Sequence, residues 1–266
     1  MLLMNAAPES SLLSPIEAPP ARVLNAHGRA QAVLVCEHAS RFIPAALDGL
    51  GLDAAAARSH AAWDIGALAL AVELMGALDA PLVQARVSRL VYDCNRPPER
   101  ADSMPEVSEV FEVPGNRNLT PAQRAQRVRE IYEPFRDLLS ATLNARPEPP
   151  VLITIHSFTP VYKGQRRDVE LGILHDQDER AARVMLDHAA GCGLRTALNE
   201  PYAAADGVTH TLREHGVARG LPNVMIEVRN DLIDTPTGIN RMAGVLAPVL
   251  ARTIAAFSPT GTEEQA

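Results

Sequence analysis

The sequence predicts an α/β fold with three layers, in which helices cover both faces of a mostly parallel or mixed central sheet. Short apolar runs that are typical of buried strands alternate with longer segments that have helical periodicity. Strands separated by helices are characteristic of such covered sheets. The length of 266 residues suits one large domain with a sizeable core.

Five apolar runs are expected to be strands, and three longer segments are expected to be helices. The strands are residues 31–36, 81–87, 151–155, 169–174 and 224–228. The helices are residues 60–78, a segment that begins at the cap Thr120 with Pro121 at its first position, and a segment that starts at about Thr237. Residues 97–119 are rich in proline and charge and are too long for a simple connection.

The two ends of the chain are expected to lie outside the domain. Residues 1–30 are rich in Ala, Pro and Ser and predict a loose N-terminal arm whose apolar residues can dock on the domain. A single domain is then expected over residues 31–257. Residues 258–266 are expected to form a frayed tail.

Composition and charge limit the partners and the compartment. A net charge of −7 gives no general attraction to nucleic acid or to an anionic membrane, so a pocket for an anionic substrate must be locally positive. No apolar run has the length of a membrane span, and the N-terminus lacks the basic segment of a signal peptide. Three widely spaced cysteines, Cys36, Cys94 and Cys192, indicate a reducing compartment. These features predict a cytoplasmic location.

Polar residues stand at the ends of three expected strands, where sites form in open α/β sheets. Glu37 and His38 follow the first strand, His156 follows the third, and Glu227 lies within the last. Histidine nitrogens and carboxylate oxygens bind Zn²⁺, and a catalytic zinc takes about three protein ligands and keeps one open position. These strand ends therefore indicate a candidate zinc site.

The two histidines need an acidic partner. Asp64, in HAAWDIGA, is preferred over Glu37, because neighbouring residues of a strand tend to point to opposite faces. His60 is a weaker competitor, one helical turn before Asp64. The proposed ligands are His38, Asp64 and His156. The alternative is that these histidines are hydrogen-bonded structural residues, the commoner role for a single histidine at a strand end.

The segment SRLVYDCNRP (88–97) predicts a subsite for a substrate carboxylate. The guanidinium groups of Arg89 and Arg96 can each bind a carboxylate through two parallel hydrogen bonds. Asn95 can donate a further bond, and Asp93 can orient a guanidinium. A surface loop with a solvated ion pair is the alternative interpretation.

A second polar segment, THTLREHG (209–216), precedes the strand that carries Glu227. His210 and Arg213 are candidates to line the same pocket and contact the substrate. A solvated helix start is an equally good interpretation of this segment, because nothing in its spacing specifies a site.

Five short motifs carry a resemblance to known enzymes. They are CEHAS (36–40), HAAWDIGA (60–67), SRLVYDCNRP (88–97), TIHS (154–157) and MIEVRND (225–231). Their order resembles that in N-formylglutamate amidohydrolases, a family similar in fold and site plan to zinc carboxypeptidases and aspartoacylases. The resemblance runs from about residue 31 to residue 235 and implies a phosphorylase/hydrolase-like fold.

The resemblance implies roles for individual residues. His38 and His156 match the histidine ligands of zinc. Asn95 and Arg96 match the pair that binds the substrate carboxylate, and Glu227 matches the general base. Residues 31–257 are accordingly expected to be a catalytic domain.

The chain departs from the carboxypeptidase pattern at one position. That pattern has a glutamate three residues after the first histidine, where this chain has Arg41. The acidic ligand must then come from elsewhere, and Asp64 is the candidate. The CEHAS motif also differs from the PHSG-like form of other formylglutamate hydrolases, which implies that another N-acyl substrate is open to this chain.

The expected function is hydrolysis of an N-acyl amino acid such as N-formyl-L-glutamate, with Zn²⁺ as cofactor and a small carboxylate-bearing molecule as substrate. Two other classes remain open. A metal-free binding protein on a degenerate hydrolase scaffold is favoured by the missing glutamate at Arg41. A serine hydrolase would use Ser157, but the sequence has no GxSxG around that residue.

Overall fold

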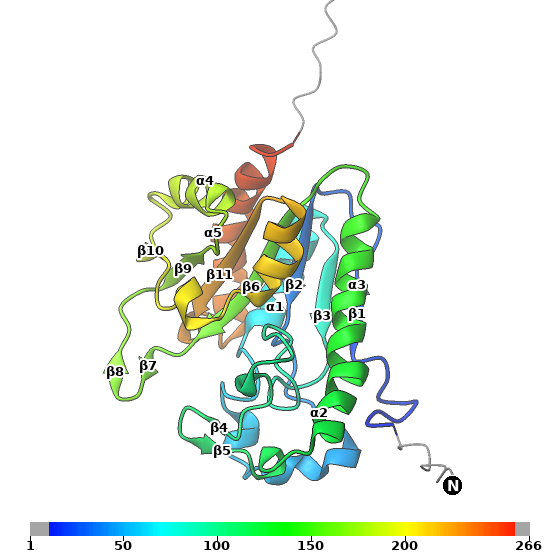
Figure 1. Cartoon of the computed structure of the whole chain (residues 1–266). Helices are drawn as coiled ribbons and strands as arrows, with labels where there is room; N and C mark the ends of the chain where they lie inside the picture. The colour runs from blue at the N-terminus through cyan, green and yellow to red at the C-terminus, as the bar shows by residue number, and fades with distance from the viewer. Residues whose placement is uncertain (1–10, 259–266) are drawn as a thin grey trace, which may run out of the picture.

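A seven-stranded sheet forms the middle layer of the computed structural model, which describes residues 11–258 (Figure 1). In spatial order its strands are β1 (Ala21–Leu24), β3 (Leu82–Ala85), β2 (Ala32–Cys36), β6 (Val151–Phe158), β11 (Asn223–Arg229), β9 (Leu171–Leu174) and β10 (Thr196–Leu198). The four strands β3, β2, β6 and β11 are parallel. β1 is antiparallel to β3, and β9 is antiparallel to β11. The prediction of a mostly parallel or mixed sheet is confirmed.

Helices cover both faces of this sheet, which confirms the three-layer prediction. One face is covered by α1 (Ala67–Leu78) and α4 (Arg180–Ala189), with α5 (Pro236–Ala255) packed against both helices in the same apolar cluster. The other packs against α3 (Glu133–Asn144) and the π-turn η7 (Leu212–Gly216) (Figure 1). Along β2 the side chains alternate between the two apolar clusters, as the pleat of a strand requires.

A capped helix precedes α3, as the sequence predicts. α2 (Pro121–Arg127) begins after Thr120, whose hydroxyl accepts a hydrogen bond from the Gln123 amide at 3.2 Å, while the Gln123 side chain accepts one from the Thr120 amide at 2.9 Å. Between α2 and α3 the chain makes the π-turn η5 (Val128–Tyr132). Pro134 follows this turn and has no N–H to donate, so the wider turn lies where regular helical bonding is interrupted.

The helix expected over residues 60–78 begins only at Ala67, so the prediction is wrong for residues 60–66. Gly66 adopts a left-handed φ of 80°, and a side chain there would collide with the carbonyl of Ile233. This contact with a distant segment keeps residues 60–66 out of the helix. The resulting turn presents Asp64 to the end of the sheet.

Part of the N-terminal arm that the sequence predicts to be loose packs on the domain. Leu12 and Leu13 are buried, whereas Ile16 is 92% exposed. Residues 21–24 form the edge strand β1, because their backbone pairs with the free edge of β3. The outer part of the arm, residues 1–10, and the tail from residue 259 lie outside the described residues.

Two small hairpins complete the fold near the carboxyl ends of the parallel strands. β4 (Val107–Ser108) and β5 (Phe111–Glu112) form the first, within the segment expected to be a long loop. β7 (Val161–Tyr162) and β8 (Gln165–Arg166) form the second, directly after β6 (Figure 1). Within residues 11–258, the helices lack the combination of length and apolar character that crossing a bilayer requires.

Candidate active site and metal centre

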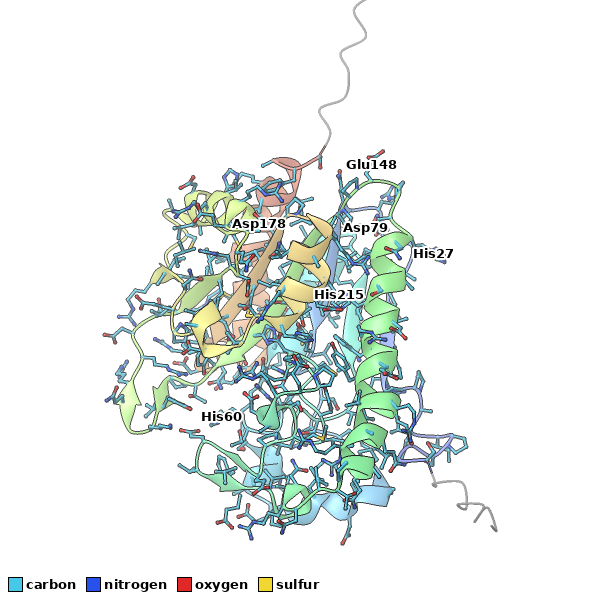
Figure 2. All side chains as sticks on the ribbon, in the orientation of Figure 1. His27, His60, Asp79, Glu148, Asp178 and His215 are labelled. Atoms are coloured by element: carbon cyan, nitrogen blue, oxygen red, sulfur yellow. The ribbon has the colours of Figure 1, made fainter. Side chains whose placement is uncertain are left out.

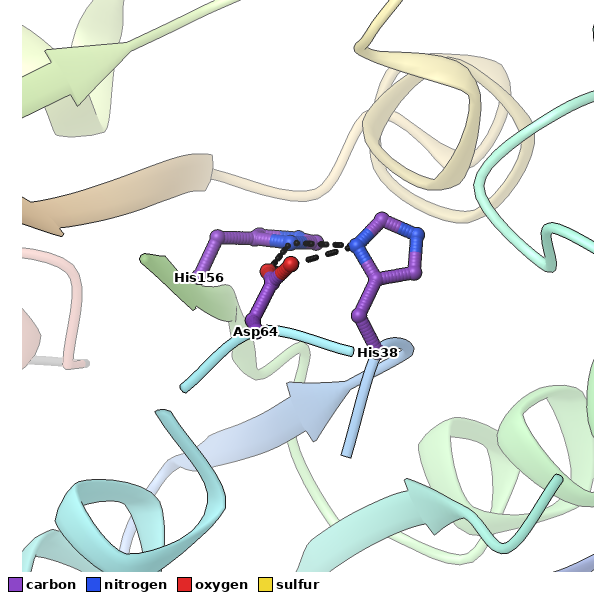
Figure 3. A group of neighbouring side chains, drawn as sticks. All are labelled: His38, Asp64 and His156. Carbon is purple, nitrogen blue, oxygen red and sulfur yellow. Dashed lines mark hydrogen bonds and ion pairs between the residues drawn. The ribbon is translucent and has the colours of Figure 1, made fainter. Parts of the chain in front are cut away.

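Three side chains from separate segments meet at the carboxyl end of the sheet (Figure 3). The Nδ1 atoms of His38 and His156 lie 3.2 Å apart. Asp64 Oδ2 lies 3.3 Å from His38 Nδ1 and 2.9 Å from His156 Nδ1. All three side chains are buried. The structure therefore brings together the two histidines and the aspartate that the sequence names as metal ligands.

The spacing of these atoms fits a bound metal ion. Nitrogen and oxygen ligands at about 2.0–2.2 Å from a tetrahedral ion lie about 3.3–3.6 Å from one another. The three distances of 2.9–3.3 Å are close to this value. Two ring nitrogens and a carboxylate oxygen facing one point also repel one another unless a proton or a cation lies between them. His38, Asp64 and His156, named here the metal group, thus fit a metal ion held by two nitrogens and one oxygen.

The local fold explains how residues 26 to 118 positions apart in the sequence converge. β2 and β6 are parallel neighbours, so the residues that follow Val35 and Thr154 emerge at the same edge. The Asp64 amide donates to the His38 carbonyl at 3.0 Å, which fixes the turn before α1 against the end of β2. The Ser157 amide donates to Asp64 Oδ2 at 3.3 Å.

The partly exposed Arg89 and the buried Asp93 form a network beside the metal group. Asp93 Oδ1 lies 2.7 Å from His38 Nε2, so it binds the ring nitrogen that faces away from the centre. Arg89 donates to Asp93 Oδ2 at 2.7 Å and to Asp64 Oδ1 at 3.2 Å. Burial alone would raise the pKa of Asp93, but the charge of Arg89 outweighs it and holds the pKa well below its ordinary value. Asp93 is therefore an anion in this network.

Glu37 has a corresponding position beside the second histidine. Its Oε2 atom lies 3.1 Å from His156 Nε2, on the side of the ring opposite to the Nδ1 atom that faces Asp64. Burial alone would lower the pKa of His156, but Glu37 and Asp64 outweigh it and raise the pKa well above its ordinary value. The carboxylates of this cluster therefore favour positive charge, whether carried by a proton or by a metal ion.

Glu227 lies next to the metal group on the adjacent strand. It is the register partner of His156 between β11 and β6, and its Oε2 atom has no hydrogen-bond partner within residues 11–258. Arg229 lies on the same face of β11 but bonds Asp231 at 2.8 Å and Glu170 at 3.5 Å. Burial raises the pKa of Glu227, the charge of His156 partly offsets this, and the nearby Asp64 raises it again, which together bring the pKa to about 7. A carboxylate with a pKa near neutrality suits proton transfer.

The metal group, Arg89 and Glu227 line one pocket with a cavity volume of about 190 Å³, enough for a molecule the size of an amino acid derivative. The pocket has a catalytic side, made by the metal group and Glu227, and a cationic side with two arginines. Its lining residues are His38, His60, Ala61, Asp64, Arg89, Asn95, Arg96, Ser108, Glu109, His156, Ser157, Phe158, Thr159, Tyr162, Tyr202, Val208 and Glu227.

A family model for the N-formylglutamate amidohydrolases matches residues 30–234, more than half of the chain and all of the pocket. The chain belongs to this family. Membership assigns it to the amidohydrolases and confirms the resemblance that the five motifs carry. The span includes the metal group and Glu227, so the site described above lies wholly inside the matched region.

Two solved structures are similar to this N-formylglutamate amidohydrolase family member. The gene product Atu2144 of Agrobacterium tumefaciens is 47% identical, with 92% of this chain and 98% of that chain covered and a TM-score of 0.90. An N-formylglutamate amidohydrolase from Ralstonia eutropha is 16% identical over 89% of this chain and 97% of that chain, with a TM-score of 0.67, and shares the fold. A comparison with curated proteins gave no match.

Of the residues predicted to contact the substrate, those of the 88–97 segment lie in the pocket, whereas those of the 209–216 segment lie outside its lining. Arg89, Asn95 and Arg96 line the pocket of this family member. Asn95 also joins two loops, because its side-chain amide donates to the Val208 carbonyl and its oxygen accepts from the Thr211 amide at 3.0 Å. Arg96 Nε donates to Asp102 at 3.0 Å.

His210 and Arg213 are absent from the pocket lining. His210 Nε2 lies 2.7 Å from the Tyr132 hydroxyl on the α3 side of the sheet. Arg213 is half-exposed and faces Asp176 at 3.8 Å. The positions of both side chains are explained by these structural contacts, which motif order alone does not reveal.

Sequence reasoning missed the aromatic wall of the pocket. Phe158, Tyr162 and Tyr202 line it, and the guanidinium of Arg167 packs over all three rings at 4.5 to 5.6 Å from their centroids. Arg167 also donates to the Tyr202 hydroxyl at 3.0 Å. The position of Phe158, directly after TIHS, was the one signal in the sequence that pointed toward this wall.

The two hairpins meet at the pocket through Glu109. Its carboxylate accepts a hydrogen bond from the Lys163 amide in the β7–β8 turn at 3.2 Å and lies 2.6 Å from His60 Nε2. Glu109 and His60 both line the pocket. His60, the weaker candidate for a metal ligand, is therefore paired with Glu109 and lies outside the metal group of His38, Asp64 and His156.

Proposed function

We propose that this chain is a zinc-dependent amidohydrolase that cleaves an N-acyl amino acid, such as N-formyl-L-glutamate, into a carboxylic acid and the free amino acid. The observation that carries the proposal is the convergence of His38 Nδ1, Asp64 Oδ2 and His156 Nδ1 in one pocket with Glu227, whose Oε2 atom has no hydrogen-bond partner among the described residues. Membership of the N-formylglutamate amidohydrolase family supports the reaction class.

The donor set supports zinc as the metal. Two imidazole nitrogens and one carboxylate oxygen from His38, His156 and Asp64 are ligands that zinc accepts, and three protein ligands leave one position open. When bound, zinc acts as a Lewis acid that polarises a carbonyl and lowers the pKa of water toward about 7. The protein contributes the remaining steps through its own side chains.

Glu227 is the proposed general base. Its carboxylate takes a proton from the attacking water as the new C–O bond forms at the acyl carbon. It then gives that proton to the amide nitrogen as the C–N bond breaks, which releases the amine. A pKa of about 7, raised by burial, allows both transfers near neutral pH.

Arg96 and Asn95 are proposed to hold the substrate carboxylate. Both side chains line the pocket, and the Asn95 amide has a second N–H beyond the one that bonds Val208. Arg89, whose side chain is 26% exposed, is the cation nearest the metal group and is proposed to stabilise the developing oxyanion. Binding at the cationic side would place the acyl group over the metal group.

The structure argues against Ser157 as a nucleophile. Its hydroxyl donates to the Ile65 carbonyl at 2.8 Å, and His156 Nδ1 faces Asp64 and His38 instead of the serine. A nucleophilic serine needs a base within hydrogen-bond reach. The metal-free binding protein is the second candidate, and metal content separates it from the enzyme.

A panel of N-formyl and N-acetyl amino acids tests the proposed function. Protein purified without added metal would be analysed by mass spectrometry for zinc and then assayed with zinc, with a chelator, and with zinc restored. We expect hydrolysis of acyl amino acids that carry a free carboxylate, loss with the chelator, and recovery with zinc. Full activity after complete metal removal, or no hydrolysis by zinc-loaded protein, would contradict the proposal.

A single variant tests the role of Glu227. Glu227→Gln keeps the size of the side chain but removes the base, so kcat is expected to fall by about 10²–10⁴ while zinc content and melting temperature stay near wild type. Glu170→Gln is the matched control, because Glu170 is paired with Arg195 and Arg229 away from the metal group. A lower melting temperature with unchanged kcat would show instead that Glu227 is structural.

A cytoplasmic location is also proposed. The three cysteines are unpaired, and Cys36 and Cys94 are buried as thiols. Such thiols suit a reducing compartment.

A further inference from the structure

Each histidine of the metal group has a carboxylate on the side of its ring that faces away from the centre. His38 presents Nδ1 to the centre and Nε2 to Asp93 at 2.7 Å. His156 presents Nδ1 to the centre and Nε2 to Glu37 at 3.1 Å. The arrangement is thus repeated, with Glu37 beside His156 in the position that Asp93 has beside His38.

Among the described residues, His156 is the one ion-pair partner of the Glu37 carboxylate. The Glu37 side chain is fully buried, and the Thr211 hydroxyl also lies near it. A buried carboxylate without a partner is costly, and so is a buried ring N–H without an acceptor. The 3.1 Å ion-pair contact puts a negative and an ionisable nitrogen group side by side, so each offsets the cost of burying the other, although neither makes a hydrogen bond of normal geometry within residues 11–258.

This contact determines which nitrogen of His156 is free to bind a metal ion. A neutral imidazole carries one proton, so an acceptor at Nε2 keeps the proton there and leaves the lone pair on Nδ1. Nδ1 is the atom that faces Asp64 Oδ2 at 2.9 Å. Glu37 cannot itself join His38, Asp64 and His156 around one ion, because it lies on the far side of the His156 ring.

We propose that Glu37 is a positioning residue that holds His156 as the Nδ1 ligand and thereby sets the affinity of the metal group. The inference rests on the proposed metal-dependent function. Carboxylates that bind the outer nitrogen of a metal-bound histidine fix its ring and increase its basicity, and their loss typically lowers metal affinity by about 10–100-fold. Glu37 is assigned this role from its contact with His156 alone.

The test compares Glu37→Gln with wild type. The glutamine has the same shape but lacks the charge, so zinc affinity, measured by competition with a chromophoric chelator, is expected to fall by about 10–100-fold. The visible absorption of the cobalt-substituted protein is expected to change as well, because the His156 ring reorients. The melting temperature of the metal-free variant should stay near that of metal-free wild type.

Two further variants make the test decisive. Glu37→Asp keeps the charge but moves it back by one methylene, so its zinc affinity should lie between those of wild type and Glu37→Gln. Glu170→Gln removes a carboxylate outside the metal group and should leave zinc affinity and the cobalt spectrum unchanged. Affinity and spectrum like wild type in Glu37→Gln, with only the melting temperature lowered, would overturn the proposal.

The proposed enzymatic function is tested separately from the role of Glu37, by hydrolysis instead of zinc affinity. Wild-type protein that binds zinc tightly but hydrolyses no acyl amino acid would refute the enzyme assignment, while the role of Glu37 would still be decided by zinc affinity measured without substrate. Wild-type protein that binds no zinc would overturn the role of Glu37 as well.

Discussion

His215 is predicted to make the stability of the protein fall as the pH is lowered. It lies in η7, within the body of the molecule, whereas the exposed His27 lies at its rim (Figure 2). Burial lowers the pKa of His215 to about 4, with smaller effects from the positive charges of Arg219 and His210. The folded protein therefore keeps this imidazole neutral at pH values where the unfolded chain protonates it.

The size of the effect follows from the two pKa values. The unfolded chain binds a proton at His215 as the pH falls below about 6.5, whereas the folded protein binds it only near pH 4. Stability from this group is complete above pH 6.5 and is lost between pH 6.5 and 4. pH 5 lies about 1.5 units below the pKa of the unfolded chain. Since each unit corresponds to about 1.36 kcal/mol, protonation of His215 in the unfolded state lowers the unfolding free energy by about 2 kcal/mol.

Urea denaturation at pH 7.5 and pH 5.0, followed by the fluorescence of the single tryptophan, Trp63, measures this loss. The protein should be free of metal, because metal binding to histidine and carboxylate ligands itself depends on pH. The pH change should lower the unfolding free energy of wild type by about 2 kcal/mol more than that of His215→Gln. His27→Gln, which changes an exposed histidine, should behave as wild type. Equal pH dependence of wild type and His215→Gln would refute the reasoning.

Three further outcomes are expected. Asp64→Asn should lower zinc affinity by at least about 100-fold, measured by chelator competition, and near wild-type affinity would exclude Asp64 as a ligand. Arg96→Lys keeps the charge but loses the planar fork, so KM should rise about tenfold with little change in kcat, and equal turnover of acid and amidated substrates by wild type would contradict this role. Phe135→Ala should lower the unfolding free energy by about 3–5 kcal/mol in urea denaturation, because Phe135 is buried; a loss below about 1 kcal/mol would show that the site repacks.

The fold class could be predicted because its signals are local. Apolar runs identify β2, β6 and β11, and the Thr120–Pro121 cap identifies α2. Short edge strands carry weaker signals, so β1 and β10 were missed. β1 exists because its backbone pairs with β3, and that pairing is set by the tertiary fold.

The first helix shows how a distant contact overrides periodicity. The alanines and Ile65 of HAAWDIGA continue the helical pattern of α1 backwards. Gly66 ends it, because its left-handed backbone lies against the Ile233 carbonyl. The contact joins residues far apart in the sequence, so periodicity within one segment does not predict it.

Site residues could be named from strand ends and motif order, but their geometry could not. The sequence named His38, Asp64 and His156 as candidate metal ligands, yet which ring nitrogen faces the centre depends on where Asp93 and Glu37 lie. His210 and Arg213 were named because they precede β11, and both have other partners.

The order of strands has a consequence for how the protein fluctuates. β2, β6 and β11, which position the two histidines and Glu227, each have a hydrogen-bonded neighbour on both sides, whereas β1 and β10 are the edges of the sheet. Local opening begins where backbone bonds are fewest, so the edge strands exchange their amide hydrogens first. Opening of β1 or β10 leaves every strand of the site paired. The two histidines and Glu227 are therefore expected to keep their places through edge fraying.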